Sequence, residues 1–129
     1  LKGYRALLVD DELDLAEVLQ DYLSIEGMSC DIATSADQAW DILQTEAYDL
    51  VFSDVVMPGE LDGLKLFERI KSQSWPVKVI LASGFSEDML VKQNQLGEEL
   101  IFVRKPYNRE QVIKAVLDAL ELGDNRNDR

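Results

Sequence analysis

The chain alternates five short apolar runs with longer amphipathic segments, and this alternation restricts its fold more than any other feature. Each run is rich in leucine, isoleucine, valine or phenylalanine and has the length of a single strand. The five expected strands are Arg5–Val9, Ser29–Ala33, Leu50–Ser53, Val77–Leu81 and Leu100–Val103. Strands that alternate with helices form parallel sheets with right-handed crossovers. The sequence therefore predicts an α/β fold in which helices cover both faces of a central five-stranded sheet.

The segment after the first run has the pattern of an amphipathic helix. Its apolar residues recur at spacings of three and four, and the face that they form consists of Leu15, Val18, Leu19, Tyr22 and Leu23. Gly27 follows as the expected left-handed cap. We expect the apolar face of this helix to lie against the sheet.

The other expected helices have recognisable starts. Ser35 stands three residues before Gln38, which is a capping-box spacing, and Asp62 and Asn108 precede two further helices. The expected buried stripes are Ala39, Trp40 and Leu43; Leu66, Phe67 and Ile70; and Val112, Ile113, Val116, Leu117 and Leu120. A fourth helix, over Ser86–Gln95, has a weaker apolar pattern, which suits a mobile element.

Composition excludes several classes of function. The chain has 129 residues, enough for one domain with its own core, and no apolar run reaches the ~20 residues that span a bilayer. A formal net charge of -12 disfavours contact with nucleic acid or membrane headgroups. The absence of histidine removes imidazole catalysis and prevents this chain from being a phosphohistidine donor. The single Cys30 excludes an internal disulfide, fits a reducing cytoplasm and is expected to be a small buried thiol.

Charged and hydroxyl residues stand at the ends of four expected strands. Asp10 and Asp11 follow the first run, Asp54 the third and Lys105 the fifth, while Ser83 stands just after the fourth. Each has an ordinary alternative role as a cap, a turn residue or a solvated side chain. Because the carboxyl ends of parallel strands meet at one edge, however, their joint occurrence predicts that they converge on one site.

Such a site would combine three carboxylates with one ammonium group. Clustered carboxylates repel one another, and a hard divalent cation such as Mg²⁺ removes that repulsion. Lys105 is expected to keep Asp54 ionised as a nucleophile. Asp54 would then attack a phosphoryl group whose oxygens are held by Mg²⁺, Lys105 and the hydroxyl of Ser83.

Four motifs, in chain order, resemble those of the receiver domains of two-component response regulators. They are Leu8-Val9-Asp10-Asp11-Glu12, Asp54-Val55-Val56-Met57-Pro58-Gly59, Leu81-Ala82-Ser83-Gly84 and Lys105-Pro106. The resemblance implies a flavodoxin-like (βα)5 doubly wound fold with strand order 2-1-3-4-5. It covers residues 1–122 as one receiver domain. Residues 123–129 are polar and are expected to form a disordered tail.

The resemblance implies a role for each acidic residue. Asp54 would accept a phosphoryl group from a partner's phosphohistidine. Asp11, Asp54 and the backbone carbonyl of Val56 would be direct Mg²⁺ ligands, and Asp10 would act mainly through water. Val56 and Phe85 flank the acceptor, and neither apolar side chain can orient an attacking water molecule. We therefore expect phosphorylated Asp54 to be long-lived.

The resemblance also implies a conformational switch. Ser83 would move toward the new phosphate, and Lys105 would pair with it, aimed inward by a cis bond before Pro106. Phe102 stands where the family carries a rotating aromatic residue. Phenylalanine lacks the hydroxyl of the commoner tyrosine, so its readout would be weaker or purely steric. The alternative for Phe102 is an ordinary core aromatic.

The implied partners are a histidine kinase or histidine phosphotransfer domain as donor, and a downstream protein or fused output domain. The chain begins at Leu1 and no output domain follows Leu122, so we expect a stand-alone receiver or a segment of a longer protein. Met57–Gly63 and Val103–Tyr107 are similar to the receivers of hybrid sensor histidine kinases.

We do not expect an enzyme: a phosphoacceptor domain carries out only self-phosphotransfer and slow autodephosphorylation. Three other functions compete with phosphoacceptor signalling. One is a receiver-like module that binds partners without phosphorylation. A haloacid-dehalogenase-type phosphatase would need a D-x-D motif on the first strand. A flavodoxin-type electron carrier would need a phosphate-binding loop there, and Asp10-Asp11-Glu12 would repel that phosphate.

Overall fold

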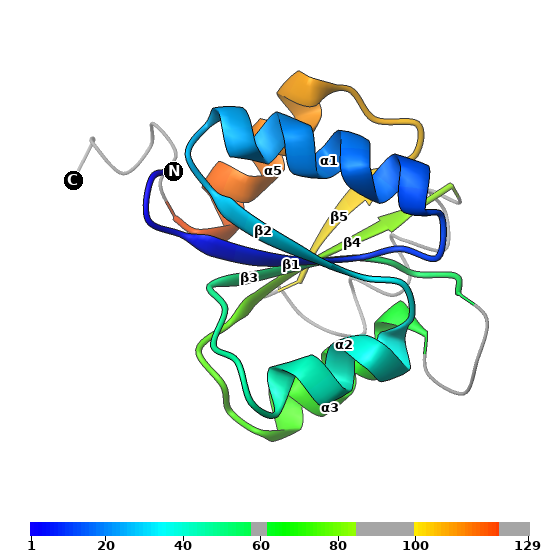
Figure 1. The fold of residues 1–129 in the computed structure, drawn as a ribbon. Coiled ribbons are helices and arrows are strands. Elements are labelled where there is room, and N and C mark those ends of the chain that lie inside the picture. The colour runs from blue at the N-terminus through cyan, green and yellow to red at the C-terminus, as the bar shows by residue number, and fades with distance from the viewer. Residues whose placement is uncertain (58–61, 85–99, 122–129) are drawn as a thin grey trace.

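The computed structural model describes residues 1–57, 62–84 and 100–121. Its centre is a parallel sheet of five strands in the order β2-β1-β3-β4-β5 (Figure 1). The strands are β1 Arg5–Val9, β2 Ser29–Ala33, β3 Leu50–Asp54, β4 Lys78–Ser83 and β5 Leu100–Arg104. The predicted α/β class, parallel pairing and flavodoxin-like strand order are therefore confirmed.

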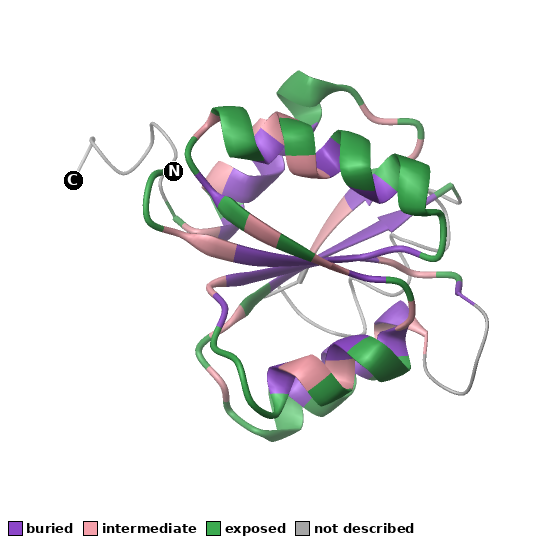
Figure 2. Cartoon of the chain, in the orientation of Figure 1, coloured by how far each residue is buried: buried purple, intermediate pink, exposed green. Residues whose placement is uncertain are grey.

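Helices cover both faces of the sheet. α1 (Leu13–Ile25) and α5 (Arg109–Ala119) lie on one face, and α2 (Ala36–Leu43) and α3 (Gly63–Ser72) lie on the other (Figure 1). The central strands are consequently buried from both sides (Figure 2), which explains their continuous apolar runs. The helix expected over Ser86–Gln95 lies outside the described residues. Within the described part of the chain, no helix is long and apolar enough to cross a membrane.

Side-chain caps begin α2, α3 and α5, as the sequence predicts. Asp62 accepts a hydrogen bond from a first-turn backbone N–H of α3 at 2.9 Å, and Asn108 belongs to a complete capping box at α5. Ser35 accepts one from the backbone N–H of Gln38 at 3.0 Å, but the Gln38 side chain accepts from Thr34 instead of completing the box. Each cap contributes about 1 kcal/mol to helix stability.

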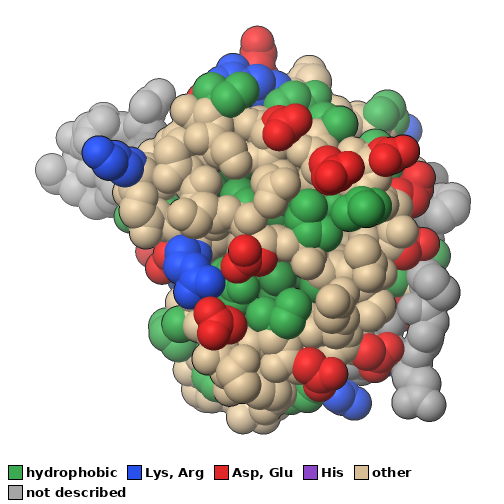
Figure 3. All heavy atoms as spheres, in the orientation of Figure 1, with side chains coloured by type: hydrophobic (Ala, Val, Ile, Leu, Met, Phe, Trp, Pro, Cys, Tyr) green, Lys and Arg blue, Asp and Glu red, His purple; other side chains and the backbone are tan. Residues whose placement is uncertain are grey.

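Helix α1 buries only part of the face predicted for it: Leu19 and Leu23 are buried and Tyr22 is partly buried. Ala16, Leu19 and Leu23 are buried, whereas Leu15 is 39% exposed and Val18 is 44% exposed. Leu15 and Val18 each precede a buried residue, so they lie about 100° further round the helix. The apolar stripe is thus wider than the surface that α1 buries, and the expectation that both residues join the core is wrong. Figure 3 shows hydrophobic side chains beside acidic ones over this helix.

Trp40 of α2 is also less buried than predicted. Ala39 and Leu43 are buried, but Trp40 is only partly buried and stacks on Trp75 in the turn before β4, with ring centroids 5.4 Å apart. The remaining expected helix residues are buried (Leu66, Phe67, Ile70, Val112 and Val116) or partly buried (Ile113, Leu117 and Leu120).

Cys30 lies on the edge strand β2 and is half-buried, not fully buried as expected. Its carbonyl accepts a hydrogen bond from Nε2 of Gln20 at 2.8 Å. Burial raises the pKa of the Cys30 thiol to about 11. The reactive thiolate is therefore scarce at neutral pH.

Candidate functional site

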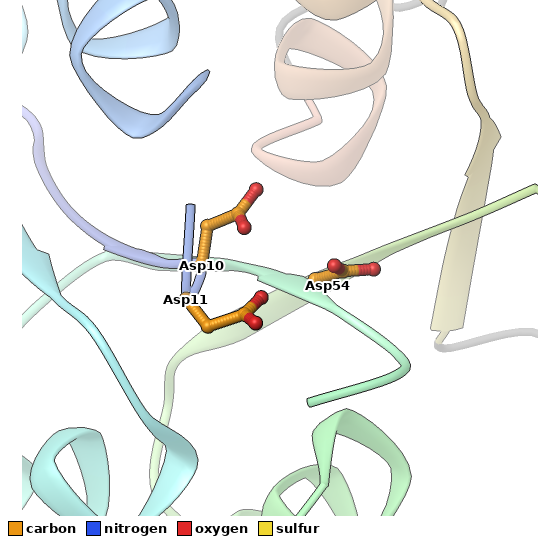
Figure 4. Close-up of side chains that lie close together, drawn as sticks. All are labelled: Asp10, Asp11 and Asp54. Carbon is orange, nitrogen blue, oxygen red and sulfur yellow. The ribbon is translucent and has the colours of Figure 1, made fainter. Parts of the chain in front are cut away.

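Three aspartates meet at the edge where the parallel strands end. Asp54 is the last residue of β3, and Asp10 and Asp11 directly follow β1. The pairing of Val9 with Ser53 sets these two strand ends side by side. One carboxylate oxygen from each aspartate lies within 4.8 Å of the others, and Figure 4 shows the three side chains grouped together. The structure thus joins residues that stand more than forty positions apart in the sequence.

Lys105 brings a positive charge into this cluster. Its Nζ donates a hydrogen bond to Oδ2 of Asp54 at 3.0 Å and lies 3.8 Å from Oδ2 of Asp10. Its backbone N–H donates to the carbonyl of Ser83 at 2.8 Å, and the bond between Lys105 and Pro106 is cis. Burial alone lowers the pKa of Lys105, but the hydrogen bond to Asp54 and the nearby carboxylates outweigh it, so the pKa is raised. The ammonium group is therefore charged at neutral pH.

Asp10 is the most enclosed of the three aspartates, with 6% of its surface exposed. Its Oδ1 accepts a hydrogen bond from the backbone N–H of Glu12 at 2.9 Å. Burial raises the pKa of Asp10, the Glu12 hydrogen bond and Lys105 oppose this, and the charges of Asp54 and Asp11 add to it. Two such charges ~4 Å apart repel by about 4 kcal/mol at an effective dielectric of ~20. One ammonium group does not balance three carboxylates, so the cluster favours a further cation.

Of the four remaining predicted site residues, three lie in the described part of the chain. Ser83 ends β4, is 5% exposed and follows the residue that pairs with Asp54. Val56 lies just beyond β3, and its side chain is 65% exposed. Phe102 lies in β5, is partly buried and packs on the core between the sheet and helices α2 and α3. Phe85 lies outside the described residues.

Two residues that the sequence analysis did not identify support the backbone of Asp54. Ser53 is fully buried, and its hydroxyl donates a hydrogen bond to the carbonyl oxygen of Asp54 at 2.9 Å. Gly63 begins α3 and donates its N–H to the carbonyl of Val55 at 3.0 Å. A Cβ at Gly63 would overlap the Asp54 carbonyl oxygen. The sequence contains a signal for each: Ser53 is a serine within an apolar run, and Gly63 is a glycine directly after the Asp62 cap.

The donor set is that of a site for a hard divalent cation. Its oxygens come from carboxylates, and neither sulfur nor imidazole takes part. Lys105 donates its hydrogen bond to Asp54, and the carboxylates of Asp10 and Asp11 lie beside that pair. Together, fold and site define a doubly wound α/β domain with an acidic group of side chains at the carboxyl edge of its sheet.

The sequence of nearly the whole chain matches one protein family. The family model of the response regulator receiver domain matches residues 6–117. The chain therefore belongs to the response regulator receiver domain family of two-component signalling. The resemblance carried by the four sequence motifs is thereby confirmed.

Individual relatives agree with this assignment. Sporulation initiation phosphotransferase F of Bacillus subtilis is 31% identical over 122 residues, which cover 94% of this chain and 97% of the relative. The receiver domain of NtrX from Brucella abortus is 33% identical, with a TM-score of 0.80 over 92% of this chain and 99% of that domain. The probable transcriptional regulator ycf29 of Porphyra purpurea is 28% identical over 88% of this chain, but the match spans only 55% of that relative.

Proposed function

We propose that Asp54 accepts a phosphoryl group from a phosphohistidine of a partner protein. A carboxylate oxygen of Asp54 forms a bond to phosphorus while the bond from phosphorus to the imidazole nitrogen breaks, and the released imidazole takes up a proton. The product is an acyl phosphate. The hydrogen bond of 3.0 Å from Lys105 to Asp54, inside a group of three aspartates, carries this proposal. It sets a positive charge where the phosphoryl oxygens would gather.

Asp11, Asp54 and the backbone carbonyl of Val56 would hold Mg²⁺ directly, and Asp10 would hold it through water. When bound, Mg²⁺ would supply neutralisation of the charge on the phosphoryl oxygens. The oxygen-only donor set and the unbalanced negative charge support this choice of metal. Lys105 would pair with the phosphate after transfer.

Phosphorylation would be read out through Ser83 and Phe102. The new group adds a charge of about -1.5 to -2 and three strong acceptor oxygens. The hydroxyl of Ser83 would move toward these oxygens, and the hydrogen bond between the Ser83 carbonyl and the Lys105 backbone would couple the two residues. Phe102 would then turn inward and shift the population of conformations at the surface of β5 and α5.

The donor would be a histidine kinase or a histidine phosphotransfer domain in the cytoplasm. The receiver would control a downstream protein or a fused output domain, and the ycf29 relative, which extends well beyond its matched part, supports the fused arrangement. The net charge of -12 argues against contact of this chain with nucleic acid or membrane. A module that binds partners without phosphorylation is the alternative.

Incubation with acetyl phosphate and Mg²⁺ tests the proposal. We expect intact-mass spectrometry to show the addition of one phosphoryl group, and removal of Mg²⁺ with a chelator to prevent it. Hydroxylamine should release the label, because it cleaves acyl phosphates. A folded protein that stays unlabelled with both acetyl phosphate and a phosphorylated histidine phosphotransfer domain would favour the phosphorylation-independent module.

Replacement of Val56 by asparagine is expected to shorten the lifetime of the phosphorylated form. The exposed side chain of Val56 cannot form a hydrogen bond to water, whereas an amide side chain at this position can orient a water molecule for attack on phosphorus. We expect decay to accelerate by about tenfold, as measured by loss of the phosphoryl mass over time. Val18→Asn makes the same change at an exposed site on α1 and should decay like the wild type. Equal or slower decay in Val56→Asn would contradict the prediction.

The exposed apolar side chains of α1 identify where the donor protein is expected to dock. α1 begins two residues after Asp11, at the same edge of the sheet as Asp54, and it presents Leu15 and Val18 to solvent. Hydrophobic residues beside acidic ones suit a recognition surface (Figure 3). A donor histidine that reaches Asp54 would bring its own helix or loop against this part of α1.

Leu15→Asp should therefore slow phosphotransfer from a histidine phosphotransfer domain by about tenfold, the effect of losing one interface anchor. The rate with acetyl phosphate should not change, because that donor needs no protein contact. Ile25→Asp is the matched control, since Ile25 is 73% exposed at the far end of the same helix. Equal slowing by both variants would show that α1 charge, and not docking near Asp54, sets the rate.

A further inference from the structure

We propose that helix α3 and the turn into β4 bind an acidic segment of a partner protein. This surface, the α3 patch, consists of Trp40, Arg69, Lys71, Trp75 and Lys78. The turn from α3 into β4 lies where β4 begins (Figure 1), whereas the aspartates lie where β1 and β3 end, at the opposite ends of these parallel strands. Binding at the α3 patch would therefore leave the phosphoacceptor site open, and it does not depend on phosphorylation.

Four of the five residues of the α3 patch lie in a basic stretch of the chain. Between Gly63 and Lys78 the chain has four lysines and arginines and one glutamate, although its net charge is -12. Arg69, Lys71 and Lys78 are exposed, and no carboxylate of a described residue forms an ion pair with any of them. By contrast, Arg5, Lys105, Arg109 and Lys114 each form an ion pair with a described carboxylate. The positive charge of the patch is thus available to a ligand.

Aromatic rings hold two of these cations in place. The guanidinium carbon of Arg69 lies 5.5 Å from the ring centre of Trp40, and Nζ of Lys71 lies 6.0 Å from that of Phe67. Trp40 in turn stacks on Trp75. A ring face attracts a cation without occupying its N–H donors. Arg69 and Lys71 therefore make no ion pair with the described residues, and their N–H donors can meet carboxylates from outside.

A cavity beside these residues adds an apolar binding element. It has a volume of about 500 Å³ and opens between α3 and the start of β4. The buried residues that line it are apolar (Phe67, Ile70 and Val79), and Trp75 is partly buried. Its exposed charged residues are Lys71 and Lys78, and none of the described lining residues is acidic. The size suits a few side chains of a bound peptide. An occupant must be anionic at the rim and apolar at the base.

The charge distribution decides between two polyanionic partners. A nucleic acid presents phosphates to the whole molecule and is repelled by its net charge of -12. A short acidic peptide segment meets only the α3 patch, because salt screens charges beyond ~8 Å at physiological ionic strength. Its apolar anchor would enter the cavity. We therefore assign the patch to an acidic protein segment with a leucine or phenylalanine anchor.

The tryptophans allow a direct test. The chain has two, Trp40 and Trp75, and both lie in the α3 patch, so their fluorescence and indole N–H NMR signals report on this surface. The probe is a peptide of about 12 residues, made of Glu and Asp around a central Leu-Phe pair. We expect a saturable shift of both indole signals when the peptide is titrated into the full chain.

Charge reversal then tests the location. The double variant Lys71→Glu/Lys78→Glu should bind the peptide at least about tenfold more weakly, whereas Lys2→Glu/Lys114→Glu, the same charge change at exposed sites elsewhere, should bind within about twofold of the wild type. Acetyl phosphate labelling should be equal in both variants, which verifies their folds. Equal weakening by both pairs would overturn the proposal. So would equally tight binding of a lysine-rich peptide or of single-stranded DNA, or no saturation at millimolar peptide.

Discussion

Asp54→Asn should abolish phosphorylation of this chain, lowering the rate with acetyl phosphate by on the order of 10³-fold or more. The neutral amide is a far weaker nucleophile than the carboxylate, while its size is kept and its oxygen can still accept the hydrogen bond from Lys105. Intact-mass spectrometry over a time course measures the effect. Circular dichroism and urea unfolding verify that the variant is folded.

The matched control for Asp54→Asn is Asp41→Asn, which removes an equal charge from an exposed position on α2. It should be labelled at the wild-type rate. Full labelling of Asp54→Asn, located by peptide mapping on another aspartate of the cluster, would show that Asp10 or Asp11 is the acceptor. That result would reject the assignment of Asp54 but keep the site.

Gly63→Ala should lower the free energy of unfolding by about 3 kcal/mol. The added Cβ would overlap the carbonyl oxygen of Asp54 and lie 2.9 Å from Cα of Val55, and both of these are backbone atoms that have little room to move. Helix α3 or the end of β3 must therefore shift. Urea unfolding measures the loss, and because Asp54 moves with its carbonyl, labelling of the folded variant should slow by tenfold or more.

Gly84→Ala is the control for this substitution. No atom of the described residues lies within 4 Å of a Cβ built at Gly84, so its stability should stay within about 0.5 kcal/mol of the wild type. Equal unfolding midpoints for Gly63→Ala and the wild type would mean that α3 moves away from β3 at little cost. The close approach of Gly63 to Asp54 would then have no role in holding the site.

The sequence predicts the strands well because their signals are local. β1 and β2 have the predicted bounds, and β3 and β5 extend one residue beyond them. β4 covers Lys78–Ser83 instead of 77–81, so Ser83 belongs to the strand and not to the turn after it. A strand ends where its ladder of hydrogen bonds ends, and that depends on the neighbouring strands.

The buried faces of the helices are predicted less well, because the width of the apolar stripe does not show how much of it is covered. Leu15 and Val18 fit the apolar stripe of α1 but face solvent, and Trp40 is only partly buried, packing on both Trp75 and the edge of the core. Hydrophobic spacing shows which side of a helix can be buried. How much of that side is covered depends on the elements that pack against it.

The sequence by itself determined the α/β class, the helix caps and the strand ends at which the aspartates and Lys105 stand, since each depends on residues close together in the chain. Tertiary structure alone decided the 3.0 Å hydrogen bond between Lys105 and Asp54, the approach of Gly63 to the Asp54 backbone and the stacked tryptophans beside α3. The physical reason is that such contacts join distant segments. Their geometry follows from strand register and helix packing, and neither can be read from a pattern of residues close together in the sequence.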